Sequence, residues 1–310
     1  MKIFVTGGAG FIGSHITDRL IEHGHKVIVV DNLSTGRRDF VNPKAKFYHL
    51  DIHDRRLNAV FSEERPDILC HHAAQVNVRK SVEDPVYDAE TNILGTLHLL
   101  KLSVTHGVKK IIFASTGGAI YGEQDYYPAD ENHPNRPISP YGISKLAVEK
   151  YLYYYHYVYD IDYISLRYAH VYGPRQDPYG EAGVVAIFIE AMLSGKSPVI
   201  HGDGQQTGDF IYVDDVVEAN MACLAFAGSD TFNIGTGIET SINQVFRKVQ
   251  ELTETTIEGR HGPGPKGEQK RNAIDPQKAI NDLHWEPRTS LAEGLKKTVA
   301  YFASELKKSS

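Results

Sequence analysis

The stretch KIFVTGGAGFIGSH (2–15) decides the fold class. An apolar run is followed by Gly7, Gly10 and Gly13, and a helical pattern then continues to about residue 23. In a dinucleotide-binding unit such glycines let the backbone turn tightly and approach a pyrophosphate, and the next helix points its N-terminus at that charge. The stretch therefore predicts a strand, a phosphate-binding turn and a helix, in that order.

The second apolar run, KVIVVD (26–31), ends in an acidic residue. Asp31 comes 18 residues after Gly13. A carboxylate at this place accepts hydrogen bonds from the adenosine ribose and repels the additional phosphate of NADP. Arg37 and Arg38 come too late in the chain to reverse that preference. The sequence therefore favours NAD over NADP, and the strand and helix around the glycines disfavour a turn that binds no ligand.

Apolar, β-branched runs alternate with helical patterns through the first half of the chain. This alternation predicts an α/β fold with a doubly wound parallel sheet (Rossmann), covered by helices on both faces. The expected strands are 2–5, 26–30, 46–50, 67–71, 110–115 and 162–168. The expected helices are 11–23, 54–64, 85–106 and 141–159.

The alternation of strand and helix patterns becomes less regular after about residue 170, where loops rich in Gly and Pro separate the elements. We expect residues 1–169 to form the NAD-binding domain and 170–310 to form mainly a smaller α/β substrate-binding domain. A segment near 209–240, with a strand at 231–235, is expected to return to the first domain. Further helices are expected at 182–194, 214–227, 241–253 and 290–306.

Composition excludes several classes of function. Of the 310 residues, 41% are hydrophobic and 23% charged, and the net charge is −6 with no long basic run. These values are typical of a soluble globular protein and give no reason to expect nucleic acid or a membrane as partner. Cys70 and Cys223 are the two cysteines, which favours a reducing, cytoplasmic location. No histidine spacing matches a zinc site, so no metal is expected.

The segment PYGISK (140–145) places Tyr141 and Lys145 four residues apart, on one face of the expected helix. Tyrosine is a poor base at neutral pH because its pKa is about 10, and a nearby ammonium group lowers that pKa. Ser115 and Thr116, at the end of the fifth strand, offer hydroxyl donors. Such a pair is frequent in helices by chance, but beside a dinucleotide loop it predicts a base for alcohol oxidation by NAD.

As a set, the motifs resemble the extended short-chain dehydrogenase/reductases, and among them the nucleotide-sugar epimerases of the UDP-glucose 4-epimerase type. The resemblance covers nearly the whole chain. It rests on TGGAGFIGSH (6–15), VVDNLSTG (29–36), LDIHD (50–54), HHAAQVNV (71–78), NILGT (92–96), STGGAIYGE (115–123), SPYGISK (139–145), LRYAHVYGPRQDP (166–178), DFIYVDDVV (209–217) and FNIGTG (232–237).

This resemblance implies roles for individual residues. Tyr141 is implied as the base, Lys145 as its partner and ribose anchor, and Thr116 as the hydroxyl helper. The implied cycle oxidises the C4 hydroxyl of a nucleotide sugar, turns the 4-keto sugar over and returns hydride to its other face. The implied NAD contacts are Gly7, Gly10, Phe11, Ile12, Gly13, Asp31, Asn32, Leu33, Ser34, Thr35, Gly36, Asp51, Ile52, His72, Ala73, Ala74, Gln75, Thr91, Asn92, Tyr141, Lys145, Tyr168 and Ala169.

The residues after Thr116 bear on the reaction. Related 4,6-dehydratases carry an acidic pair there and decarboxylases carry a glutamate, whereas this chain has Gly117 and Gly118. Reductases of the family usually prefer NADPH, which Asp31 disfavours. Epimerisation of a UDP-hexose is therefore expected. The alternatives are a dehydratase or oxidoreductase of the same family, an epimerase for a different nucleotide sugar, and an NAD-binding sensor, which would usually lack the Tyr–Lys pair.

The substrate end departs from the family pattern. His170 stands where an asparagine is usual, and Gly208 and Pro265 stand where phosphate-binding arginines are usual. Either neighbouring cations, including Lys266 and Lys270, replace these arginines, or the substrate differs. The implied substrate contacts are Thr116, Gly117, Gly118, Tyr141, His170, Arg175, Val185, Ile200 and Arg271.

The run YLYYYHYVYD (151–160) continues the helix of the Tyr–Lys pair, with Tyr151, Tyr155 and Val158 on one face. These side chains either pack inside the domain or form an interface. The family commonly pairs this helix and the one at 85–106 across a two-fold axis, so a homodimer is expected.

Overall fold

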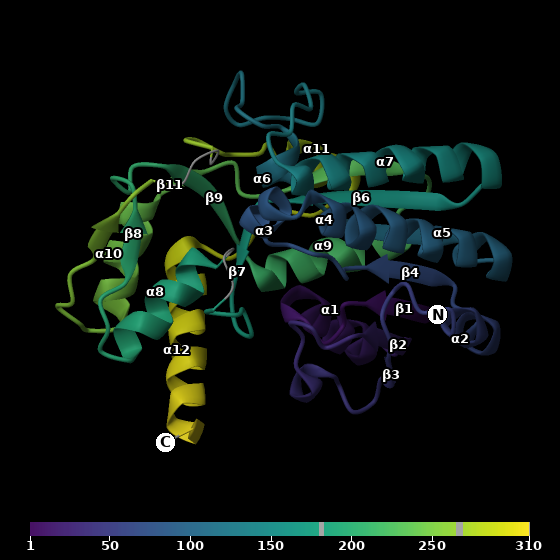
Figure 1. The fold of residues 1–310 in the computed structure, drawn as a ribbon, viewed down its shortest axis with the longest axis horizontal. Coiled ribbons are helices and arrows are strands. Elements are labelled where there is room, and N and C mark those ends of the chain that lie inside the picture. Colours follow the sequence, from purple (N-terminus) through teal and green to yellow (C-terminus); the bar gives the residue numbers. More distant parts are fainter. Residues whose placement is uncertain (180–182, 265–268, 310) are drawn as a thin grey trace.

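The computed structural model describes residues 1–179, 183–264 and 269–309, and its centre is a parallel sheet flanked by helices (Figure 1). This confirms the predicted doubly wound α/β fold. In spatial order the seven strands are β10 (Asp230–Ile234), β6 (Asp162–Tyr168), β5 (Lys110–Thr116), β4 (Ile68–His71), β1 (Lys2–Thr6), β2 (Lys26–Asp31) and β3 (Lys46–His49).

The order of the strands reverses between β1 and β4. From β1 the chain adds β2 and β3 on one side, and then crosses to add β4, β5 and β6 on the other. Because all pairings are parallel, every strand ends at the same edge of the sheet. Loops from neighbouring strands diverge at such a reversal and leave the crevice in which these folds bind ligands.

Two helical layers cover the sheet because its side chains alternate between faces. On β1, Ile3 and Val5 point into one core and Phe4 into the other. The first core packs against α1 (Phe11–Glu22) and α9 (Val213–Ala225), and the second against α2 (Leu57–Glu64), α5 (Gly95–His106) and α7 (Pro140–Tyr159). Strands buried on both faces explain the continuous apolar runs of the sequence.

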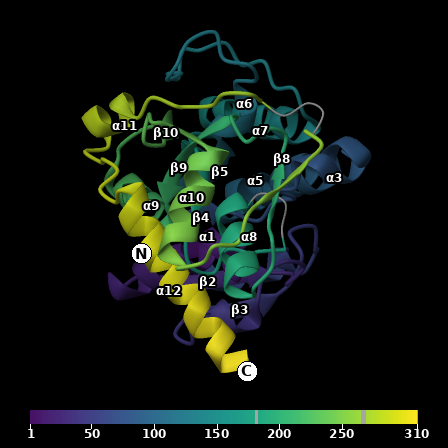
Figure 2. The ribbon, with the colours of Figure 1, turned by 90° about the vertical axis from the view of Figure 1, so that its left-hand side faces the viewer.

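A smaller α/β lobe lies beside the sheet and has its own hydrophobic core (Figure 2). It contains α8 (Val184–Leu193), α10 (Ile242–Leu252), α12 (Leu291–Ser309) and the short strands β7 (His170–Tyr172), β8 (Val199–His201), β9 (Thr207–Tyr212), β11 (Glu239–Ser241) and β12 (Arg260–Gly262). After this lobe begins, the chain returns to the main sheet through α9 and β10. The exact boundary at residues 169/170 stays a prediction.

The helix expected over 85–106 is divided. It consists of α4 (Pro85–Ala89), a π-helical turn labelled η2 (Glu90–Leu94) and α5, and it is preceded by α3 (Val78–Glu83). The Asp84 carboxylate accepts a hydrogen bond from the Tyr87 N–H and starts α4 at Pro85. The remaining short elements are η1 (Arg38–Phe40), α6 (Gly117–Ile120) and α11 (Gln277–Asp282). In the described ranges, no helix is long and apolar enough to cross a membrane.

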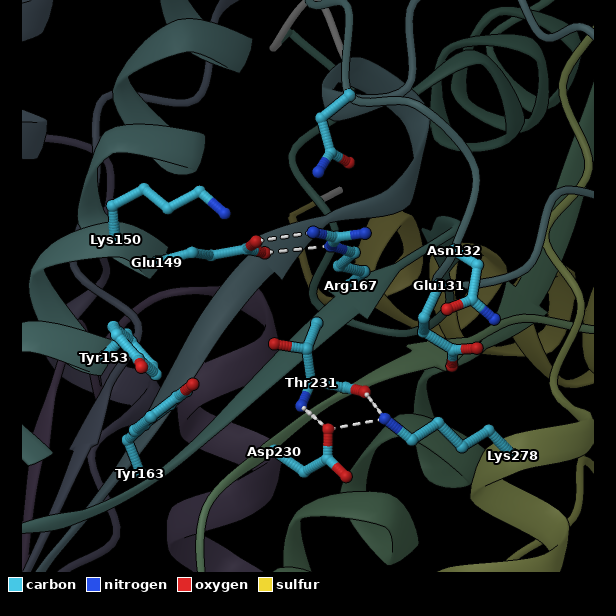
Figure 3. A pocket seen from close by; sticks show the side chains of 11 residues that line it. Glu131, Asn132, Glu149, Lys150, Tyr153, Tyr163, Arg167, Asp230, Thr231 and Lys278 are labelled. Atoms are coloured by element: carbon cyan, nitrogen blue, oxygen red, sulfur yellow. Dashed lines mark hydrogen bonds and ion pairs between the residues drawn. The ribbon is translucent and has the colours of Figure 1, made fainter. Parts of the chain in front are cut away.

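A buried ion pair joins α7 to the sheet (Figure 3). Arg167 on β6 donates from Nε and Nη2 to the Glu149 carboxylate on α7, at 3.0 and 2.6 Å, and both side chains are 5% exposed. The Ser115 and Ser165 hydroxyls donate to the same carboxylate at 2.6 and 3.1 Å. The pair lies at the wall of a hollow of about 480 Å³. It therefore holds β5, β6 and α7 in one arrangement.

Replacing Arg167 by methionine should lower the free energy of unfolding by about 3–5 kcal/mol, because the Glu149 carboxylate would stay buried without its counter-charge. Urea unfolding measures the loss. Arg56→Met is the control, since Arg56 pairs with Asp54 at the exposed surface and should change stability by less than about 0.5 kcal/mol. A loss for Arg167→Met as small as that of the control would contradict the role of the pair.

Candidate active site

The glycine loop after β1 approaches its neighbours more closely than any side chain would allow. Gly7 has φ +69°, and a Cβ there would lie 2.7 Å from the Ala73 nitrogen. A Cβ on Gly13 would lie 2.2 Å from the Gly7 oxygen. Gly10 precedes α1 and no side chain caps that helix. The first N–H groups of α1 therefore face the crevice without a side-chain partner, which fits the pyrophosphate of a dinucleotide.

The residues expected around adenosine meet at the ends of β2 and β3. The Asp31 carboxylate accepts hydrogen bonds from the N–H groups of Ala9 and Leu33 at 3.0 and 2.8 Å, and burial raises the pKa of Asp31 while these bonds lower it. The Asn32 amide donates to Asp51 at 2.7 Å. Ser34 and Thr35 are exposed, Gly36 contacts Asp31, and Ile52 is buried against Gly95.

Several other expected NAD contacts lie at or after the ends of β4 and β6. His72 Nε2 lies 3.1 Å from the Tyr168 hydroxyl, which accepts a hydrogen bond from the Asn220 amide at 2.8 Å. Gln75 and Asn92 exchange backbone and side-chain hydrogen bonds at 2.9 Å each. The partly exposed residues Phe11, Ile12, Ala73, Ala74 and Thr91 and the buried Ala169 belong to the same edge of the sheet.

Three elements bring the predicted catalytic residues together. Thr116 ends β5 and caps α6, where its Oγ1 accepts a hydrogen bond from the Ala119 N–H at 3.2 Å. Tyr141 lies in the first turn of α7, and its hydroxyl contacts Thr116. Lys145 lies one turn later, buried, with Nζ 5.8 Å from the centre of the Tyr141 ring. The helix starts here because Ser139 caps it and Pro140 occupies its first position.

The charges around Tyr141 differ from the expectation. Burial and the Asp88 carboxylate raise the pKa of Tyr141, while Thr116 lowers it. The pKa of Tyr141 is thus raised where the sequence predicted a lowering. Lys145 Nζ donates to the Ala114 carbonyl at 2.7 Å and lies over the Phe113 ring at 4.7 Å. Burial lowers the pKa of Lys145 to about 8. Asp88 and Glu149 oppose this lowering, so the charge of Lys145 depends on nearby carboxylates.

The expected substrate residues are only partly brought together. A Cβ on Gly118 would lie 3.8 Å from both Thr116 Oγ1 and His170 Cε1, so His170 stands close to the catalytic threonine. A Cβ on Gly208 would lie 3.0 Å from His170 Nδ1, so the imidazole occupies the space that a side chain at 208 would need. A Cβ on Gly117 would meet Ile274 at 2.6 Å, which leaves no room for an acidic side chain there.

Other expected substrate residues have protein partners. Arg175 pairs with Asp18 on α1 at 2.8 Å. Arg271 donates to Glu239 at 2.9 Å and lies over the Tyr127 ring at 4.0 Å. Val185 and Ile200 are buried in the core of the smaller lobe. Pro265 and Lys266 lie outside the described residues. Contact of Arg175, Arg271, Val185 and Ile200 with substrate therefore stays a prediction.

Comparison with known proteins places this site in a family. The model of the NAD dependent epimerase/dehydratase family matches residues 3–235. This chain belongs to that family. The recognition made from the motifs is thereby confirmed, and so is NAD as the cofactor, for which the glycine loop and Asp31 supply a fitting site.

Members of the family resemble the chain over its whole length. The UDP-glucose 4-epimerase of Mycolicibacterium smegmatis is 42% identical over 98% of this chain and 99% of that protein. The structure of the Thermotoga maritima UDP-glucose 4-epimerase with UDP-glucose is 51% identical, with a TM-score of 0.97 over 99% of this chain and 100% of that chain. That of the Thermus thermophilus enzyme with NAD is 43% identical, with a TM-score of 0.94 over 97% and 99%.

Sequence reasoning missed two buried carboxylates next to the family's Tyr–Lys pair. Glu149 follows Lys145 by four residues, and Asp88 precedes Asn92 by four. Both spacings place an acidic side chain on the helical face of a residue that was singled out. This signal was present in the sequence, although the spacing alone does not distinguish a buried acid from a solvated one.

Gly13→Ala should weaken NAD binding at least tenfold, about 1.4 kcal/mol, because its Cβ would collide with the Gly7 carbonyl and separate α1 from the loop. Calorimetric titration of NAD into protein stripped of cofactor measures the change. Gly107→Ala is the control: its φ is +75°, which costs an alanine some backbone strain, but a Cβ there meets nothing within 4 Å. Unchanged NAD affinity in Gly13→Ala would contradict the assignment of the loop.

Proposed function

We propose that the protein is a UDP-hexose 4-epimerase that interconverts UDP-glucose and UDP-galactose by transient oxidation at C4. The convergence of Tyr141, Lys145 and Thr116 beside the NAD crevice carries the proposal. The full-length similarity to UDP-glucose 4-epimerases supports it. A cytoplasmic location belongs to the same proposal, supported by two buried, unpaired cysteines.

In this proposal Tyr141 removes the proton of the C4 hydroxyl and later returns it. Thr116 positions the substrate oxygen, because its Oγ1 accepts the Ala119 N–H and its hydroxyl proton can be donated to a neighbouring oxygen. Lys145 places its ammonium group 5.8 Å from the centre of the phenol ring. Bound NAD supplies the acceptor and then the donor of hydride. Since the proton and the hydride both return to the sugar, the net change is isomerisation.

The glycines after Thr116 support epimerisation over dehydration. Elimination of water needs an acid beside the reacting carbon. Ile274 fills the space at Gly117, and Gly118 opens toward His170. A second candidate function is 4-epimerisation of a different nucleotide sugar. It is favoured by His170 and Gly208, which give the substrate end a shape unlike the usual family pattern.

Purified protein supplied with UDP-glucose and no added cofactor should form UDP-galactose without accumulating NADH. Tyr141→Phe should reduce turnover at least 10²-fold, by loss of the proton acceptor, while NAD stays bound. Product stereochemistry by NMR measures turnover in the wild type and in Tyr141→Phe, and the absorbance of NADH measures its accumulation. Accumulation of NADH would indicate an oxidoreductase, and near-normal turnover in Tyr141→Phe would contradict the mechanism. Conversion of only GDP-, CDP- or dTDP-sugars would favour the second candidate.

We further propose that α7 forms a homodimer interface. Ile143, Tyr151, Tyr154 and Val158 are 53%, 39%, 48% and 48% exposed and follow one another along a single helical face. A shallow hollow of about 420 Å³ lies on this face, lined by Ala147, Lys150, Tyr151 and Tyr154. Tyrosine suits an interface because its body is apolar and its tip polar.

Sedimentation velocity should give the mass of two chains for the wild type and one chain for the double variant Tyr151→Glu, Tyr154→Glu, since buried carboxylates would oppose association. Tyr179→Glu is the control: Tyr179 is 84% exposed on a loop, and this variant should remain dimeric. A dimeric double variant would place the interface elsewhere.

A further inference from the structure

Asp88 on α4 is a fully buried carboxylate that receives three hydrogen bonds. The Ser144 hydroxyl donates to Oδ2 at 2.7 Å, and the Gln75 and Asn92 amides donate to Oδ1 at 2.9 and 3.0 Å. Its exposed fraction is 0%. All three partners present donors, so both oxygens of the carboxylate act as hydrogen-bond acceptors.

The three donors come from three separate segments, whose relative positions the proposed reaction depends on. Gln75 belongs to the cofactor-side loop after β4, Asn92 to the π-helical turn, and Ser144 directly precedes Lys145 on α7. Through Asn92 the network continues to Thr96, since the Thr96 hydroxyl donates to the Asn92 carbonyl at 2.6 Å. One carboxylate therefore joins the cofactor side of the crevice to the catalytic helix.

The charge of Asp88 has no direct ion-pair partner in the part of the chain that the structure describes. Glu149, the other carboxylate near Lys145, is neutralised by Arg167. Within the described residues, the other titratable groups that face Lys145 are Tyr141 on α7, His71 at the end of β4 and His72 directly after it. Burial lowers the pKa of both histidines, that of His72 to about 3, so they carry no charge at neutral pH.

The electrostatic balance at Lys145 follows from this arrangement. Burial lowers the pKa of its ammonium group to about 8, and Asp88 opposes this more strongly than Glu149 does. Without Asp88, the desolvated amine would lose its proton at a lower pH. The same negative charge raises the pKa of Tyr141. The negative charge of Asp88 thus favours the protonated form of both Lys145 and Tyr141.

We propose that Asp88 is a positioning residue that acts as the buried counter-ion of Lys145 and fixes the catalytic helix to the cofactor-side loop. The inference deepens the proposed function and rests on it for the catalytic role of Lys145. The charge coupling between the two side chains, in contrast, can be measured in the absence of any reaction.

The test is a direct titration of Lys145 by NMR in protein with ¹³Cε-labelled lysine, the resonance being assigned through Lys145→Arg. The wild-type midpoint is expected near pH 8. In Asp88→Asn it should fall by about one unit, because a neutral amide no longer stabilises the ammonium. Ser144→Ala, the matched control, removes one hydrogen bond but keeps the charge, so its midpoint should stay within about 0.3 units of wild type.

An unmoved midpoint in Asp88→Asn would overturn the inference, as would equal shifts in Asp88→Asn and Ser144→Ala, which would indicate loss of structure alone. If Asp88→Asn does not fold, Asp88→Glu takes its place. Its retained charge should hold the midpoint within about 0.5 units of wild type, and a fall of about one unit would overturn the inference.

The alkaline limb of the turnover profile should move to lower pH with the NMR midpoint in Asp88→Asn. A wild-type protein without epimerase activity whose Lys145 midpoint still responds to Asp88 would refute the proposed function and leave the charge coupling standing. Epimerase activity in a protein whose Lys145 midpoint does not respond to Asp88→Asn would support the proposed function and refute the charge coupling.

Discussion

The backbone of Gly7 lies against the segment that follows β4, and the rest of the crevice depends on this contact. Gly7, Gly13 and the Ala73 nitrogen approach within distances that no Cβ could share. The approach brings the first turn of α1 beside the loop after β4. The first N–H groups of α1 and the expected NAD contacts that follow β4 therefore lie along one edge of the sheet. Because β1, β4 and β5 pair in parallel, the end of β5 lies at the same edge of the sheet, and Thr116 is the last residue of β5.

The second half of the site is organised by buried charge. Two carboxylates near α7 are buried, and the free-energy cost of removing each from water is offset in a different way. Glu149 forms a direct pair with Arg167 and ties α7 to the sheet. Asp88 is held by neutral donors, and the cation whose charge it supports is Lys145. Since an unpaired buried ion costs several kcal/mol, the arrangement links the charge of Lys145, the proposed partner of Tyr141, to the packing of the helices around it.

Features set by local sequence patterns were predictable from the sequence, and features set by contacts between distant residues were not. Alternating apolar runs, the glycine spacing and Asp31 sufficed for the sheet and the NAD edge, because period and turn chemistry are local. The π-helical turn at Glu90–Leu94 was not predicted, since it serves the contact of Asn92 with Gln75, residues 17 apart. The partners of Arg175 and Arg271 are likewise tertiary choices, and a guanidinium in the sequence does not reveal which carboxylate it meets.

At the expected substrate site, the two departures from the family pattern at His170 and Gly208 are sterically linked. His170 fills the volume that Gly208 leaves open, and its ring also faces the space above Gly118. An arginine at 208 could not enter without displacing this imidazole, so the two positions are sterically coupled. Arg271, engaged by Glu239, would need to exchange one anion for another to reach a diphosphate. We therefore expect His170 and Gly208 to act together on substrate choice, since a side chain at 208 cannot be added while the imidazole keeps its place.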